Sequence, residues 1–324
     1  MKSEFAECTV LSSLLGGAGI KLVDIGGRGS ALSALAPLAS FADYYASEPD
    51  RAEAERLTRQ LPLEAPWRTV TVLSEAIASR RGEAQLYLTN QPGMSSLLEP
   101  DPAVTGHFYL SGKFEVMGTT TVPTVPLDEA ASHYGFADAC FLKVDTQGTE
   151  LDILQSGSRL VRRSLLAVYV ECSFRAFYRN QALFGDVDGY LRDNGFTLFS
   201  LSRTNLRRAG YRASLHSTRV TTWAHCLYFR EPETLVNADD AAAGRDVARL
   251  LGLALAFRHH DLAFEIVSIL RRLRLLADSD LDRLEDELER IAASRTRRII
   301  RKAEQHDLKN AVMAPAFRDR RQVE

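Results

Sequence analysis

The sequence predicts an α/β protein whose core is a doubly wound, mostly parallel sheet. Strand-like and helix-like runs alternate between residues 20 and 232, as in consecutive β-α-β units with right-handed crossovers. The clearest unit spans residues 141–154, where an apolar run stops at Asp145, a polar turn follows and Glu150 opens a segment with helical spacing. Ligands bind at the carboxyl ends of strands in open α/β sheets, so Asp145 is predicted to lie at the functional edge.

Each predicted element follows from the local pattern of apolar residues. Apolar and β-branched runs predict strands at residues 20–23, 41–47, 67–73, 85–89, 118–125, 141–144, 165–171, 196–201 and 223–229. Spacing of three and four predicts helices at residues 51–60, 127–133, 150–155 and 183–193. The last two strands have no clear helix between them, so we expect an antiparallel edge.

A glycine-rich loop follows the first strand. After Asp24 it contains Gly26, Gly27 and Gly29, and Ser30 is placed to cap a helix starting at Ala31. Glycines let a ligand approach the backbone, and a helix N-terminus offers free N–H groups. The spacing differs from the Gly-x-Gly-x-x-Gly dinucleotide fingerprint. Both a nucleotide-like ligand and a simple tight turn are therefore compatible with this loop.

Glu48 lies at the end of the next predicted strand. An acidic residue at that position can accept hydrogen bonds from ribose hydroxyls. A glutamate before a proline is usually just solvated, but together with the glycine loop Glu48 favours a bound nucleoside.

The sequence divides into an N-terminal segment (1–19), an α/β domain (20–232), a helical extension (233–310) and a tail expected to be mobile (311–324). In the extension, apolar residues recur at intervals of three and four: Leu281, Leu284, Leu288 and Ile291. This stripe covers only about two heptads, which favours a packing face within the chain over a coiled coil. A homo-oligomer formed through these helices is the alternative.

Composition narrows the range of partners. Forty basic and 42 acidic residues give a net charge of −2, so no nucleic-acid partner is expected. The cysteines Cys8, Cys140, Cys172 and Cys226 are far apart and signal neither a zinc site nor a disulfide framework. The apolar runs are too short for a transmembrane segment. A cytoplasmic protein is the expectation.

Several motifs occur in an order and spacing that resembles the FkbM-type methyltransferases between about residues 20 and 230. They are Asp24-x-Gly, Glu48-Pro49, Ser95-Ser96-Leu97 and Lys143-Val-Asp-Thr-Gln-Gly-Thr-Glu150. The resemblance implies a class I, Rossmann-like methyltransferase fold that uses S-adenosylmethionine (SAM) to methylate a hydroxyl of a sugar, glycan or related natural product. A nucleotide-binding oxidoreductase and a non-catalytic SAM-binding module are the alternatives.

The resemblance assigns the cofactor to Asp24, Gly26, Gly27, Gly29, Glu48, Ser74, Glu75 and Asp145, with Ser74 and Glu75 near the adenine. One departure concerns Arg28. The family loop commonly reads Asp-x-Gly-Ala-Asn-x-Gly, whereas this chain has Gly27 and Arg28. Arg28 has no role in the family pattern.

Methyl transfer to a hydroxyl needs alignment of the acceptor and a group that takes the hydroxyl proton. Asp145 and Glu171 are the predicted catalytic residues, although Asp145 could instead cap the following helix. As a carboxylate pair they could hold magnesium, but nothing in the spacing demands it and no metal is predicted. His107 and His133 are alternative bases, each isolated in the sequence. The predicted acceptor-binding residues are Ser95, Ser96, Lys143, Gln147, Arg175 and Tyr178.

Overall fold

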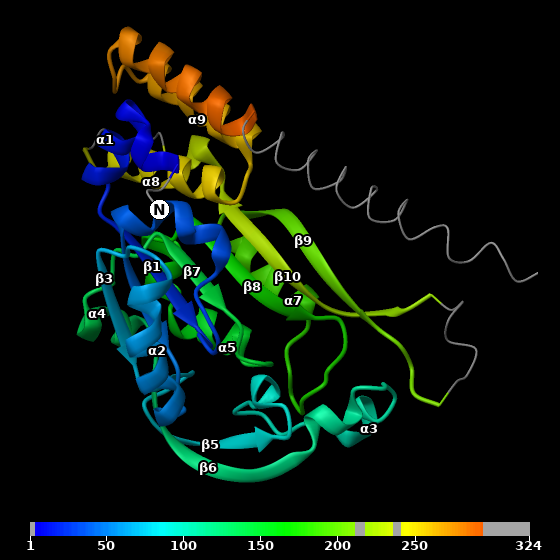
Figure 1. Cartoon of the computed structure of the whole chain (residues 1–324). Coiled ribbons are helices and arrows are strands. Elements are labelled where there is room, and N and C mark those ends of the chain that lie inside the picture. Colours follow the sequence, from blue (N-terminus) through cyan, green and yellow to red (C-terminus); the bar gives the residue numbers. More distant parts are fainter. Residues whose placement is uncertain (1–3, 211–217, 236–240, 294–324) are drawn as a thin grey trace, which may run out of the picture.

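The computed structural model describes residues 4–210, 218–235 and 241–293. Its centre is a seven-stranded sheet (Figure 1). The strands are β1 (Ile20–Ile25), β2 (Ala42–Ser47), β3 (Thr69–Leu73), β7 (Phe141–Val144), β8 (Ala167–Ser173), β9 (Phe196–Leu206) and β10 (Val220–Arg230). Their order is β3-β2-β1-β7-β8-β10-β9; β10 is antiparallel to both β8 and β9, and the other neighbouring pairs are parallel. The predicted mostly parallel sheet with an antiparallel edge is confirmed.

The strand order reverses between β1 and β7. From β1 the chain moves outward to β2 and β3, and it later returns to place β7 on the other side of β1. Loops on the two sides of such a switch point leave in opposite directions and open a crevice at the carboxyl edge. The loops after β1 and β7 therefore lie together at the edge predicted to be functional.

Helices cover both faces of the sheet. One face packs against α4 (Leu127–Tyr134), α5 (Glu150–Ser156), α6 (Ser158–Arg163) and α7 (Phe184–Asp193). The other is covered by α2 (Arg51–Glu64) and α8 (Ala241–Ala256), and α1 (Thr9–Gly17) and α9 (His260–Arg272) pack against α8. With both faces covered, five of the six residues of β1 are buried, as expected of a central parallel strand.

The prediction of an α-helix from Ala31 is wrong in both the helix type and the first residue. Residues Ser33–Phe41 form a 3₁₀ helix that contains Pro37, and no side chain caps it. Proline lacks the N–H that an α-helix needs and disfavours the α conformation of the preceding residue. The glycine loop therefore leads into a short irregular connection to β2.

Two of the predicted strands lie outside the central sheet. β5 (Gly82–Thr89) and β6 (Val116–Val125) pair antiparallel, and the short β4 (Ala76–Ile77) joins them in a three-stranded sheet. Figure 1 shows this small sheet across the end of the molecule where β1 and β7 finish. It covers the crevice between the loops.

The two ends of the described chain pack together. Helical residues 278–293 bury all four residues of the apolar stripe, Leu281, Leu284, Leu288 and Ile291, so the packing face is confirmed. Glu287 accepts hydrogen bonds from the N–H groups of Thr9, Val10 and Leu11 at 2.7–3.2 Å, which satisfies the free end of α1. In the described residues, no helix combines the length and apolar character needed to cross a bilayer. The tail 311–324 lies outside the described residues.

Candidate active site

A cavity of about 280 Å³ lies at the carboxyl edge of the sheet. Its walls come from the loops after β1, β2 and β7, from β4 and β5, and from the segment after β5 that contains Pro92, Gly93, Ser95, Ser96 and Leu97. Six of the predicted site residues line it: Gly26, Glu48, Ser95, Ser96, Asp145 and Gln147. The structure thus brings together predicted site residues from four separate segments of the sequence.

Gly26 joins the loops after β1 and β7. Its φ is +79°, and a Cβ at this position would overlap the carbonyl oxygen of Asp145. Only glycine tolerates both the left-handed backbone and this close approach. The other two loop glycines, Gly27 and Gly29, do not line the cavity.

Glu48 is 5% exposed in the cavity wall and accepts a hydrogen bond from the N–H of Asp50 at 3.0 Å. Burial raises the pKa of this carboxyl. Arg28 lies beside it, 2.7 Å from the Asp50 carboxylate and 3.8 Å from that of Glu48. The residue that departs from the family pattern therefore compensates two carboxylates at the cavity wall.

Asp24 and Lys143 form a buried ion pair beneath the cavity. Lys143 Nζ donates to Asp24 Oδ1 at 2.7 Å and to the Gly26 carbonyl at 3.3 Å, while Tyr44 Oη donates to Asp24 Oδ2 at 2.7 Å. Both oxygens of Asp24 are thus engaged by protein groups. The charges of Asp24 and Asp145 outweigh the effect of burial, and raise the pKa of Lys143.

Ser74 and Glu75 do not reach this cavity. Ser74 lines a separate hollow beside α2. The Glu75 carboxylate accepts a hydrogen bond from Tyr134 Oη at 2.7 Å, which together with burial raises the pKa of Tyr134 to about 12. The structure therefore does not place these side chains with the other predicted cofactor residues.

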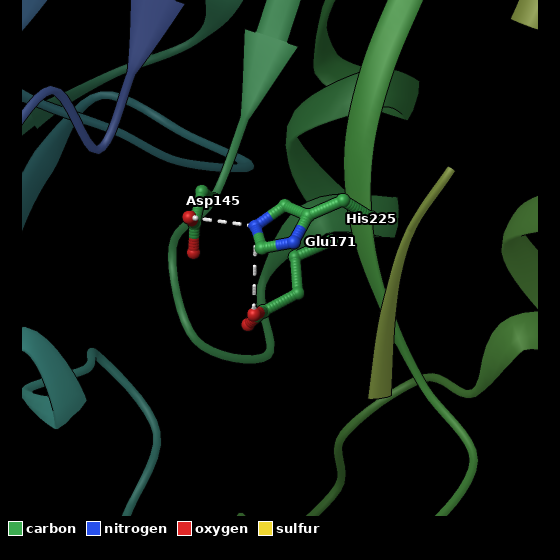
Figure 2. A group of neighbouring side chains, drawn as sticks. All are labelled: Asp145, Glu171 and His225. Carbon is green, nitrogen blue, oxygen red and sulfur yellow. Dashed lines mark hydrogen bonds and ion pairs between the residues drawn. The ribbon is translucent and has the colours of Figure 1, made fainter. Parts of the chain in front are cut away.

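Four polar side chains, Asp145, Gln147, Glu171 and His225, gather next to the cavity, and we call them the Asp145 cluster. Figure 2 shows His225 Nε2 facing both carboxylates. It lies 3.4 Å from Asp145 Oδ2 and 3.8 Å from Glu171 Oε1. The side chains are 24%, 11% and 30% exposed for Asp145, Glu171 and His225, so the cluster is reachable from outside.

Gln147 orients the two carboxylates. Its Nε2 donates to Asp145 Oδ1 at 2.9 Å and to Glu171 Oε2 at 2.8 Å. Its Oε1 accepts from Tyr178 Oη at 3.3 Å, and its own φ is +61°, a left-handed conformation that is uncommon for a non-glycine residue. The amide thereby leaves the second oxygen of each carboxylate facing His225.

The pKa values of the two carboxyls of the cluster are shifted in opposite directions. Burial and the nearby charge of Asp145 raise the pKa of Glu171 well above its ordinary value. Burial also disfavours ionised Asp145, but the hydrogen bond with His225 and the charge of Lys143 outweigh it and lower the pKa. Two interacting carboxylates separate their titrations in this way. Asp145 is therefore the more acidic member of the pair.

Asp145 does not cap α5, contrary to the alternative raised from the sequence. The helix begins at Glu150 with Thr149 as its N-cap residue. The buried Glu150 carboxylate accepts from the N–H groups of Thr146 at 2.9 Å and Gly148 at 3.0 Å. Glu150 thus holds the loop, and Asp145 is left to face the cluster.

His225 is the residue that sequence reasoning missed. It lies on β10, directly opposite Glu171 on β8 in the antiparallel register. The two histidines considered instead, His107 and His133, are exposed. The available signal was a histidine in the predicted edge strand, but its partner depends on a register that the sequence does not state.

The remaining predicted acceptor residues are mostly structural in this geometry. Ser95 Oγ accepts from the Thr89 N–H at 3.1 Å, and Ser96 Oγ donates to the Gln147 carbonyl at 2.8 Å. Tyr178 is 2% exposed and belongs to a small aromatic core. Arg175 is exposed. The serines and Tyr178 therefore fix the walls, and Arg175 lies at the surface.

Comparison with solved structures finds low sequence identity to methyltransferases. Methyltransferase FkbM from Methylobacillus flagellatus KT is 16% identical, with 65% of this chain and 44% of that chain covered and a TM-score of 0.34. Magnesium protoporphyrin IX methyltransferase (ChlM) from Synechocystis PCC 6803 with bound SAM is 17% identical, with 68% and 76% covered and a TM-score of 0.33. The match thus spans less than half of the Methylobacillus chain.

The family is shown by the sequence itself. No curated protein matches the chain. A family model described as the methyltransferase FkbM domain matches residues 32–198, more than half of the chain. This match begins after the glycine loop and includes Glu48, Asp145 and Glu171. The chain belongs to the FkbM family of SAM-dependent methyltransferases.

Proposed function

We propose that this protein transfers the methyl group of SAM to a hydroxyl of a sugar, glycan or related natural product. One observation supports the proposal most: Asp145 both lines the cavity and belongs to the Asp145 cluster. A cofactor in the cavity and a hydroxyl at the cluster would meet at this carboxylate. Such alignment is the main requirement of an in-line displacement.

The cavity wall carries groups that fit SAM. The Glu48 carboxylate can accept hydrogen bonds from the ribose hydroxyls, and Gly26 permits a close approach to the backbone. Ile77, Leu86 and Leu88 provide an apolar surface suited to a planar adenine ring. Bound SAM supplies an electrophilic methyl group on a sulfonium.

The acceptor hydroxyl is placed against the carboxylates of the Asp145 cluster. As the new O–CH₃ bond forms, the S–CH₃ bond breaks, the sulfonium becomes a neutral thioether and the hydroxyl proton leaves the acceptor oxygen. Asp145, held by Gln147, receives the hydrogen bond of the hydroxyl, and the Asp145–Glu171 pair receives its proton. Three cluster residues thus act by orienting the acceptor and moving one proton.

Calorimetry with SAM, S-adenosylhomocysteine and NAD tests the cofactor assignment. We expect binding of the first two, and a loss of about 10- to 100-fold in SAM affinity for Glu48→Ala, since a hydrogen bond to a charged group contributes about 1.5–3 kcal/mol. Glu55→Ala is the matched control, because Glu55 is exposed on α2. Absence of SAM binding would overturn the proposal, and NAD binding would favour an oxidoreductase.

Turnover with methyl-labelled SAM tests the acceptor class. A panel of sugars, glycans and hydroxylated polyketides is incubated with the protein, and labelled product is separated from cofactor. We expect label in at least one hydroxylated compound and none in its deoxy counterpart. Transfer to amines or thiols only would contradict O-methylation.

A further inference from the structure

We propose that the Asp145 cluster is a binding site for a divalent transition-metal cation. Asp145, Glu171 and His225 each offer one ligand atom, and the three atoms all lie within 4.8 Å of one another. They come from the loop after β7, from β8 and from β10, so three neighbouring segments of one sheet edge converge on a single point. Sequence reasoning had paired only the two carboxylates and predicted no metal.

The spacing of the ligand atoms leaves room for a shared cation. His225 Nε2 lies 3.4 Å and 3.8 Å from the two carboxylate oxygens, beyond the usual range for a short charge-assisted contact. Ligand atoms that share a cation at about 2.1 Å lie about 3.0 Å apart in octahedral and about 3.4 Å apart in tetrahedral coordination. Small side-chain movements would bring all three atoms to these separations.

Neighbouring side chains orient the three ligand atoms. Gln147 holds one oxygen of each carboxylate, at 2.9 Å and 2.8 Å, so that the other oxygen faces His225. Gln147 is itself held by Ser96 Oγ, which donates to the Gln147 carbonyl at 2.8 Å, while Tyr178 Oη lies 3.3 Å from its Oε1. Outer groups of this kind set the orientation of metal ligands and are worth 10- to 100-fold in affinity.

The charge balance also favours a cation. In the described part of the chain, no lysine or arginine forms an ion pair with Asp145 or Glu171. The nearest ammonium, that of Lys143, is paired with Asp24 at 2.7 Å. An amide and an imidazole are therefore the direct partners of two half-buried carboxylates, and a divalent cation would balance them.

The donor set indicates which cation fits. One imidazole and two carboxylates suit manganese, iron or zinc, whereas magnesium prefers oxygen ligands alone. Three protein ligands leave coordination positions for acceptor oxygens. This role rests on the proposed function and changes only the destination of the proton: with the cation bound, Asp145 and Glu171 act as ligands, the cation would lower the pKa of the bound acceptor hydroxyl, and the proton would leave to water as the O–CH₃ bond forms.

Manganese titration of the metal-stripped protein tests the site. Protein treated with EDTA and desalted is titrated with Mn²⁺, free ion is measured by electron paramagnetic resonance, and Zn²⁺ is used as a competitor. We expect one Mn²⁺ per chain, a loss of at least tenfold in affinity for both His225→Ala and Glu171→Gln, and a 10- to 100-fold loss for Gln147→Ala. His133→Ala, an exposed histidine on α4, should bind as the wild type does.

Two results would overturn the site: no binding of Mn²⁺ or Zn²⁺ at millimolar concentration, or less than tenfold weakening in both ligand variants. Thermal melting distinguishes lost ligands from lost folding, because without metal each variant should melt cooperatively, and Mn²⁺ should raise the Tm of each variant less than that of the wild type. If the stripped protein binds SAM and methylates at the full rate, the role of the cation fails and the proposed function stands. If Mn²⁺ binds at the cluster but SAM does not bind, the proposed function fails alone.

Discussion

Two carboxylates at adjacent strand ends, Asp24 and Asp145, have opposite surroundings. Asp24 is 2% exposed, and Lys143 and Tyr44 engage both of its oxygens at 2.7 Å. Asp145 faces a second carboxylate, an amide and a histidine, and its side chain is 24% exposed. A buried charge that the protein compensates fully holds the structure together, whereas a more open one without a lysine or arginine partner can receive an external proton or cation.

The different surroundings of Asp24 and Asp145 result from the position of Lys143 on β7. Lys143 and Asp145 are two residues apart in the segment that forms β7 and its following loop, yet Lys143 pairs across to β1 rather than with Asp145. The ammonium thereby fixes the glycine loop through Asp24 and the Gly26 carbonyl. Asp145 therefore has no ion pair with Lys143, and its carboxylate faces His225 in the Asp145 cluster.

The largest expected effect is on catalysis at the open carboxylate. Asp145→Asn removes the charge and the acceptor of the hydroxyl proton, so we expect kcat at saturating SAM to fall by about 10²- to 10⁴-fold. Asp152→Asn, the same substitution at an exposed position of α5, should retain activity. Full turnover of Asp145→Asn on an identified acceptor would remove this residue from the mechanism.

Removing the counter-charge of Asp24 should reduce the stability of the fold. Lys143→Met leaves Asp24 buried without its counter-charge, and we expect a loss of about 3–5 kcal/mol in the free energy of unfolding measured by urea denaturation. Lys21→Met is the control, since the Lys21–Asp138 pair at 2.6 Å is partly exposed and should cost about 0–1 kcal/mol. Equal losses in the two variants would contradict the assigned structural role. Adding Asp24→Asn to Lys143→Met should recover part of the loss.

Gly26 lies between Asp24 and Asp145. Its carbonyl accepts a hydrogen bond from Lys143, and its Cα faces the Asp145 carbonyl so closely that a Cβ would overlap it. Gly26→Ala combines a left-handed backbone with a steric overlap, and should cost about 2–3 kcal/mol of unfolding free energy and weaken SAM binding. Gly29→Ala has a φ of +104° but open space around it, and should cost about 1 kcal/mol. A smaller effect at Gly26 than at Gly29 would show that the loop contact is unimportant.

The smallest effect concerns a third carboxylate at this edge, Glu48. Burial raises its pKa in the folded state, so the folded protein binds this proton more tightly than the unfolded chain does. Its contribution to the free energy of unfolding therefore falls as pH rises from about 4.3, the ordinary glutamate value, through the raised folded value. SAM affinity should rise over the same window, because ribose hydroxyls donate to the ionised carboxylate. Glu48→Gln should abolish both trends in calorimetry and denaturation at several pH values.

Most strands could be predicted because their signals are local. Apolar runs ending at Asp24, Ser47 and Val144 were expected as strands and are β1, β2 and β7. The small sheet could not be separated from the central one, since the pairing of β5 with β6 depends on contacts that local pattern does not encode. The 3₁₀ helix at Ser33–Phe41 shows a proline overriding a predicted α-helix.

Some residues of the candidate site could likewise be predicted from the sequence, and others could not. Glu48, Asp145 and Glu171 were found from their places at or near strand ends, where α/β folds carry ligands. His225 could not be found, because an antiparallel register places it opposite Glu171. The supporting role of Gln147 also escaped prediction, since its two carboxylate partners come from different strands.

The sequence alone determined the fold class, the family and the edge at which the chemistry lies, because alternating apolar runs and short motifs are properties of neighbouring residues. Only the tertiary structure decided which carboxylate is compensated and which is open. Lys143 is two residues from Asp145 and 119 from Asp24, yet it pairs with Asp24. In a β-α-β fold the strands that become neighbours are set by crossovers, and the charge balance of each site follows from that arrangement.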